Sequence, residues 1–101
     1  MYRSLKVDIS TAGDNAIIPA TAGQKISVYR FFLIAHGAVD VTFKDGSTDL
    51  SGPLPLTGKG ASLTLAASGD PWFEGSTGND LNLNLSAAAR VCGRIYYRLG
   101  V

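Results

Sequence analysis

The chain has 101 residues, of which 46% are hydrophobic and 17% charged, and its formal net charge is +1. This length is typical of one domain with its own core, and such a composition argues against intrinsic disorder. A net charge near zero gives no reason to expect a nucleic-acid-binding protein. The sequence has one Cys and one His, which excludes an internal disulfide and any site built on two histidines. We therefore expect one domain over residues 1–101, with no cofactor and no metal.

The sequence shows no signal for a membrane. Its longest apolar run, from Phe31 to Ala35, is much too short to cross a bilayer. The first residues alternate between polar and apolar and never develop the apolar stretch of a signal peptide. We therefore expect a protein that is made in the cytoplasm and not exported through a cleaved signal.

The N-terminal part of the chain has the two-residue period of β-strands. Residues 4–10 alternate between polar and apolar, and residues 16–18 form a short apolar strand that ends at Pro19. Residues 25–35 are the most hydrophobic segment. Alternation predicts two faces for this strand, one with Ile26, Val28, Phe32 and Ile34 and the other with Tyr29, Phe31, Leu33 and Ala35. A strand that is apolar on both faces lies centrally in its sheet or forms an interface.

The rest of the chain continues the same pattern. Further strands are predicted at residues 39–44, 54–56, 62–65, 72–74, 81–85 and 91–101. Pro55 confines its strand to an edge or a loop, and we expect Leu83 and Ile95 to lie in the core. About eight short strands separated by turns are typical of an all-β antiparallel β-sandwich. We expect a jelly-roll-like rather than an immunoglobulin-like arrangement.

No set of residues in the sequence predicts catalysis. His36 as a general base would need a nucleophile and an orienting carboxylate, and Ser27 and Asp40 are close in sequence but not arranged as a triad. Cys92 is predicted to be a small mid-strand residue with no histidine base near it. We therefore expect that the protein is not an enzyme.

A short acidic loop leaves a metal site open. Asp45, Ser47 and Asp49 alternate as in the first half of a calcium loop, but Leu56 stands where the closing glutamate would be required. A hairpin turn whose aspartates bond the backbone is the preferred interpretation. A weak calcium site at the surface is the alternative.

Two groups of residues are candidates for contact with a partner. Arg90, Arg94 and Arg98 share a strand face with Tyr96 by their even spacing, and Arg and Tyr are enriched at protein interfaces. Internal ion pairs with aspartates are an equally good interpretation, and phosphate binding is a weaker one. Trp72 and Phe73 are adjacent on a strand, so one is expected in the core and the other in contact with a partner or a sugar.

Several stretches resemble a group of small virion proteins of tailed bacteriophages. They are Gly46–Pro53, Trp72–Glu74, Leu81–Ala88 and the β-rich C-terminal tail, within a resemblance that spans roughly residues 15–101. Arg90 and Cys92 do not belong to the resemblance.

This resemblance implies a non-enzymatic virion protein that is assembled in the host cytoplasm. Its members decorate or cement the head, so the implied partner is the major capsid protein or another virion protein. A homo-oligomer is expected because residues 25–35 are apolar on both faces and one small domain can cover only one of them, and the resemblance favours a trimer over a dimer. The alternative is a small tail, baseplate or fibre-associated protein with a glycan-binding surface. The candidate interface residues are Arg90, Arg94, Tyr96, Arg98, Trp72, Phe73, Tyr29 and Phe31.

Overall fold

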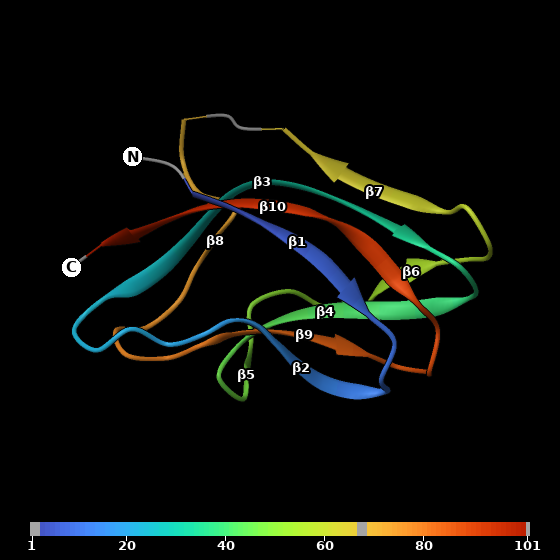
Figure 1. Cartoon of the computed structure of the whole chain (residues 1–101), viewed down its shortest axis with the longest axis horizontal. Helices are drawn as coiled ribbons and strands as arrows, with labels where there is room; N and C mark the ends of the chain where they lie inside the picture. The colour runs from blue at the N-terminus through green and yellow to red at the C-terminus, as the bar shows by residue number, and fades with distance from the viewer. Residues whose placement is uncertain (1–2, 67–68, 101) are drawn as a thin grey trace.

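The two layers of the molecule are both β-sheets. The structure is a computed structural model that describes residues 3–66 and 69–100. These residues form ten strands in two five-stranded antiparallel sheets, which face each other in Figure 1. Within the same ranges there is no helix of the length and apolarity that a membrane crossing needs.

The two sheets, A and B, each combine strands that are distant in the sequence. The strand order of sheet A is β1 (Arg3–Ile9), β10 (Val91–Gly100), β3 (Lys25–Ala35) and β7 (Ser62–Leu65), and β8 (Phe73–Glu74) also pairs with β3. The order of sheet B is β2 (Gly13–Ile18), β9 (Leu81–Leu85), β4 (Val39–Asp45) and β5 (Thr48–Asp49), and β6 (Leu54–Leu56) also pairs with β4.

The connections make this sandwich a jelly roll. The chain passes from one sheet to the other at every connection except β4 to β5, β5 to β6 and β7 to β8, so most chain neighbours lie in opposite layers. This is the double Greek-key arrangement of a jelly roll. The predicted all-β antiparallel sandwich is confirmed. The prediction of about eight short strands omits β5, and β5 and β8 have only two residues each.

A β-bulge in β3 changes which of its residues face the core. Tyr96 of β10 pairs with Arg30, whereas the next residue, Tyr97, pairs with Val28, so Tyr29 is an extra residue in β3. One extra residue reverses the alternation of side chains beyond it. The core-facing residues are therefore Ile26, Val28, Phe31, Leu33 and Ala35. The predicted division of this strand into two faces is wrong at the bulge.

The core lies between the two sheets and contains one aromatic cluster. The ring centroid of Phe43 lies 4.8 Å from that of Phe31 and 4.7 Å from that of Phe73. Leu83 and Ile95 are both 0% exposed, which confirms the prediction for them.

Gly93 allows β10 and β3 to approach closely. It pairs with Leu33 of β3, and a Cβ at this position would overlap the carbonyl oxygen of Phe32 and lie 3.1 Å from the Cα of Leu33. Only a residue without a side chain fits here.

Candidate protein-interaction surface

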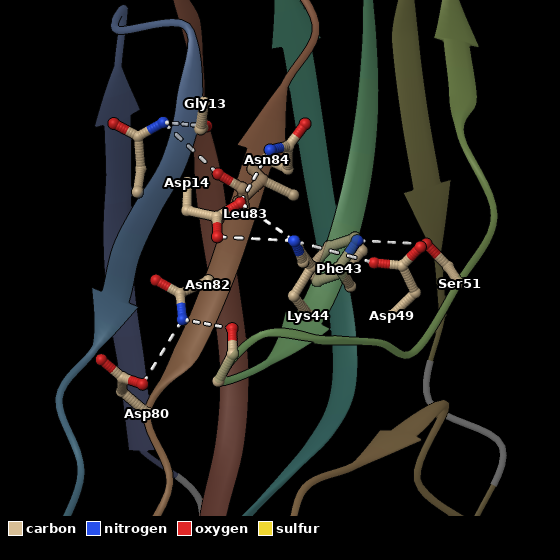
Figure 2. A network of polar contacts seen from close by, with 12 residues as sticks. Gly13, Asp14, Phe43, Lys44, Asp49, Ser51, Asp80, Asn82, Leu83 and Asn84 are labelled. Carbon is tan, nitrogen blue, oxygen red and sulfur yellow. Dashed lines mark hydrogen bonds and ion pairs between the residues drawn. The ribbon is translucent and has the colours of Figure 1, made fainter.

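The outer face of sheet B is covered by polar side chains that bond one another. Figure 2 shows Lys44 of β4 between Asp14 of β2 and Asp49 of β5, with Nζ–Oδ1 distances of 3.3 and 3.8 Å. Asn84 of β9 donates to Asp14 Oδ1 at 2.7 Å, and Asn82 donates to the carbonyl oxygen of Gly46 at 2.9 Å. The bond from Asn84, with help from Lys44, lowers the pKa of Asp14. A face whose polar groups already have partners gains little by docking.

The outer face of sheet A differs because large apolar side chains lie on it. Phe32 is 42% exposed and Ile34 41% exposed, and both point outward because of the bulge at Tyr29. Trp72 is 43% exposed and precedes β8 at the edge of the same sheet, where its Nε1 donates to the carbonyl oxygen of Ala66 at 2.8 Å. Within residues 3–66 and 69–100 these are the only exposed large hydrophobic residues. Phe32 and Ile34 are neighbours on the outer face of β3, and Trp72 lies at an edge of the same sheet; exposed apolar side chains that lie together are typical of an interaction surface.

The outer face of sheet A also has an excess of positive charge. Its strands contribute the outward-facing cations Lys6, Lys25, Arg30, Arg94 and Arg98 and the carboxylates Asp8 and Glu74, and Arg90 lies directly before β10. Both carboxylates are already paired: Asp8 binds Arg90 at 2.9 Å and Glu74 binds Lys25 at 3.0 Å. The outer face of sheet B has the opposite balance: Lys44 binds Asp14 and Asp49, and Asp40 adds a third carboxylate nearer the start of β4.

The three arginines predicted to form a contact surface, Arg90, Arg94 and Arg98, have different surroundings in the structure. Arg90 forms a bidentate ion pair with Asp8, with bonds of 3.0 and 2.9 Å, so the interpretation as an internal ion pair holds for it. This pairing raises the pKa of Arg90 further above its usual value. Arg94, Tyr96 and Arg98 lie on the outer face of β10, with Arg98 exposed and the other two half-buried. Arg94 donates to Ser4 Oγ at 2.9 Å, a neutral partner, and it forms no ion pair with any residue that the structure describes.

Three of the predicted contact residues are placed differently by the structure. Phe31 is 2% exposed and lies in the core, because the bulge at Tyr29 turns it inward, so its assignment to an interface is wrong. Tyr29 is the half-buried bulge residue. Phe73 is half-buried and stacks on Phe43, while its neighbour Trp72 is exposed. The expected opposite placement of Trp72 and Phe73 is thus confirmed, with Trp72 as the surface residue. Phe32 and Ile34, which the sequence did not identify as contact residues, take the place of Phe31.

A polar cluster around Cys92 was not predicted from the sequence. Cys92 Sγ lies 3.8 Å from His36 Nε2 and 3.5 Å from Asp8 Oδ1. The expectation of a cysteine with no histidine near it is therefore wrong. Hydrogen bonds from Arg90 and then Cys92 lower the pKa of Asp8 to about 2. Asp8 contacts the thiol of Cys92 and the guanidinium of Arg90. In a nucleophile–base–carboxylate triad the carboxylate instead contacts and orients the base, so the contacts of Asp8 differ from those of a triad carboxylate.

The three residues of the predicted acidic loop do not converge. Asp45 is buried at the end of β4, where its Oδ2 accepts a bond from the backbone nitrogen of Ser76 at 3.0 Å. Asp49 contacts Lys44 on the outer face of sheet B, and Ser47 is exposed. In the part of the chain that the structure describes, no three His, Cys, Asp or Glu side chains form a metal-binding group. Asp45 and Asp49 are therefore not partners in a calcium site.

Stability is expected to fall in acid because several carboxylates have lowered pKa values. Hydrogen bonds and ion pairs hold the pKa of Asp8 at about 2, against 3.8 normally, and lower those of Asp14 and Glu74. Burial raises the pKa of Asp45, but bonds from Ser76 and Asn79 outweigh this, and the net shift is downward. A carboxyl group whose pKa is lower in the folded state stabilises the fold at pH values above its unfolded-state pKa. This stabilisation is lost as the pH falls through its folded-state pKa.

The melting temperature should therefore be nearly constant from about pH 7 to 5 and should fall between about pH 4 and 2. Circular-dichroism melts across this range measure it. Asp8→Asn should make this fall in melting temperature less steep, because it removes one of the titrating groups. An unchanged melting temperature down to about pH 2 would contradict the pKa shifts.

Comparison with known proteins identifies no family for this chain. No protein-family model matches the sequence, and no curated protein matches it significantly.

Proposed function

We propose that this chain is a non-enzymatic bacteriophage virion structural protein that decorates and cements the capsid shell. Its binding surface is the outer face of sheet A, and its partner is the major capsid protein or another virion protein. The observation that supports this proposal is the contrast between the two faces of the sandwich. Sheet A exposes Phe32 and Ile34 among cations, whereas sheet B presents polar side chains that already bond one another.

The energetics of such a surface suit an adhesive role. Apolar area removed from water stabilises a complex by roughly 25 cal/mol per Å² before the costs of ordering are subtracted. Arg94 and Tyr96 on β10 add planar donors and an aromatic ring, which are enriched at the centres of protein interfaces. Many weak contacts repeated over a shell add up through multivalency. A protein that binds only the assembled shell stabilises that state by mass action.

Trp72 supports a second candidate function. Its indole is exposed and is held in place by the bond from Nε1 to Ala66, so its ring is a fixed aromatic surface at the edge of sheet A. Rings of this kind stack against sugars. A tail or fibre-associated protein with a glycan-binding surface is the corresponding alternative. Copy number in purified virions separates the two, because a head decoration protein is present in many copies and a tail protein in few.

Reversal of charge on the outer face of sheet A should weaken binding to the shell. We expect the double variant Arg94→Glu/Arg98→Glu to bind stripped shells at least about tenfold more weakly than the wild-type protein. The reason is that a shell surface complementary to a cationic face would repel the new carboxylates. Added salt should weaken wild-type binding in the same direction. Co-sedimentation with shells measures both effects, and a circular-dichroism melt shows that the variant is folded.

Lys59→Glu is the control for this experiment. Lys59 is exposed in the loop before β7, so the variant changes the charge outside the strands of sheet A. Its binding should equal that of the wild type. Equal binding by the double variant would exclude this face as the interface, and a protein that purifies with tails would exclude the decoration function.

A further inference from the structure

The outer face of sheet A contains a hollow to which the proposed function assigns no role. It has a volume of about 210 Å³ and opens to solvent between β10, β3 and β7. Its lining includes Arg30, Phe32, Thr64, Leu65, Ala66 and Tyr96. Most of these groups are apolar, and the exposed ring of Phe32 is one wall. A hollow of this kind receives an apolar or aromatic side chain better than a polar one.

The cation beside the hollow determines what the rest of the ligand should be. The guanidinium carbon of Arg30 lies 4.0 Å from the centre of the Tyr96 ring, so the arginine is held by a cation–π contact. Within residues 3–66 and 69–100 Arg30 forms no ion pair. Its planar N–H groups can therefore donate two hydrogen bonds to one carboxylate next to the hollow. Lys6 and Arg94 extend the positive charge across the same face.

We propose that this hollow is the anchoring subsite of sheet A, and that it binds an apolar or aromatic side chain within an acidic segment of the partner protein. The side chain enters between Phe32, Thr64 and Ala66, which share the outer face, and a neighbouring carboxylate of the segment pairs with Arg30. The proposal deepens the proposed function and rests on it, because it specifies the partner chemistry of the same face. Charge complementarity is the argument for an acidic partner, since this face has an excess of cations.

Two other occupants fit the face less well. A second copy that used the same face would bring like charges together, which opposes binding. Single-stranded nucleic acid needs a row of open rings on which successive bases stack. Here the Tyr96 ring has Arg30 over it and Ile34 is aliphatic, so Phe32 is the only exposed large apolar ring on β3 and β10. An acidic protein segment is therefore preferred.

The test uses the full chain and short synthetic peptides. The probe is a pentapeptide with one phenylalanine between two pairs of glutamates, and the observable is the amide NMR shift of Thr64, Leu65 and Ala66. We expect saturable shifts with a dissociation constant in the millimolar range. A matched peptide with alanine in place of phenylalanine, and another with lysines in place of glutamates, should each bind at least about fivefold more weakly.

Two variants test the two halves of the proposed subsite. Arg30→Gln keeps most of the side chain but removes its charge, and should weaken binding of the acidic peptide by about tenfold. Ala66→Leu fills the hollow and should abolish the preference for phenylalanine over alanine. Lys59→Gln, which removes a cation outside the face, should have no effect.

Several outcomes would overturn the inference. They are the absence of saturable shifts, equal binding of the phenylalanine and alanine peptides, and tighter binding of single-stranded oligodeoxythymidine at the same amides. The peptide result is separate from the shell experiment. Shell binding that survives Arg30→Gln and Ala66→Leu would exclude the hollow but keep the decoration function, whereas absence of shell binding by the wild-type protein would exclude that function itself.

Discussion

Replacement of Gly93 by alanine should unfold the protein or destabilise it more than any other single added methyl group. The new Cβ would overlap the carbonyl oxygen of Phe32, which belongs to the backbone of the neighbouring strand. β10 lies between β1 and β3, so neither neighbour can move away without breaking the ladders of sheet A. We expect a loss of unfolding free energy on the order of 4 kcal/mol. Urea unfolding followed by circular dichroism measures this loss.

Gly100→Ala on the same strand is the matched control. A Cβ at Gly100 would have no heavy atom within 4 Å, so this variant adds the same methyl group without a collision. Its stability should be equal to or slightly above that of the wild type, because alanine restricts the conformational freedom of the unfolded chain more than glycine does. If Gly93→Ala had the same free energy of unfolding as Gly100→Ala, β10 and β3 would not be as close as described.

Truncation of the core should have the second largest effect. Leu83 lies at the middle of β9 and Ile95 in β10, both fully buried, one in each sheet. Leu83→Ala and Ile95→Ala should each lower the free energy of unfolding by about 2–5 kcal/mol, because the cavity left behind cannot collapse between two sheets. For a domain of this length that corresponds to a fall in melting temperature of roughly 10–30 °C.

Asn84→Ala is the control for core truncation. Asn84 follows Leu83 on β9 but points outward, where it donates a hydrogen bond to Asp14. Loss of that bond should cost about 1 kcal/mol. If Asn84→Ala destabilised the protein more than Leu83→Ala, the inward and outward faces of β9 would be reversed.

Strands with a regular alternation could be predicted from the sequence down to the orientation of single residues. Leu81, Leu83 and Leu85 alternate with asparagines and are buried, as their pattern indicates. Only the hydrophobic period is needed for this, because the strand pairs without irregularity with β4. The same period was sufficient to predict an all-β sandwich.

The faces of β3 could not be predicted in this way. Its residues are apolar at almost every position, so both phases of the alternation bury hydrophobic side chains and the pattern gives no evidence of a bulge. The extra residue at Tyr29 is detectable only from the pairing with Tyr96 and Tyr97. The bulge exchanges Phe31 for Phe32 at the surface, so the candidate interface changed with it.

The polar clusters were also beyond sequence analysis. Cys92 and His36 are 56 positions apart, and Asp8 and Arg90 are 82 apart. They meet only because β10 pairs with both β1 and β3 in a fixed register. Hydrophobic periodicity predicts that strands exist but not which of them become neighbours, so the sequence allowed an ion pair for Arg90 but could not identify Asp8 as the partner.

The position of β10 determines when this domain can fold during its synthesis. β10 is the last strand in chain order, yet it lies between β1, the first strand, and β3. Until residues 91–100 have left the ribosome, β1 has no partner in sheet A and β3 has one open edge. Sheet A therefore cannot assemble strand by strand as the nascent chain emerges. Contacts between the two ends of a chain form slowly because a long loop must close first. The domain should consequently fold only once residues 91–100 have emerged, and the open edge of β3 is the segment that a chaperone or another nascent chain would meet before then.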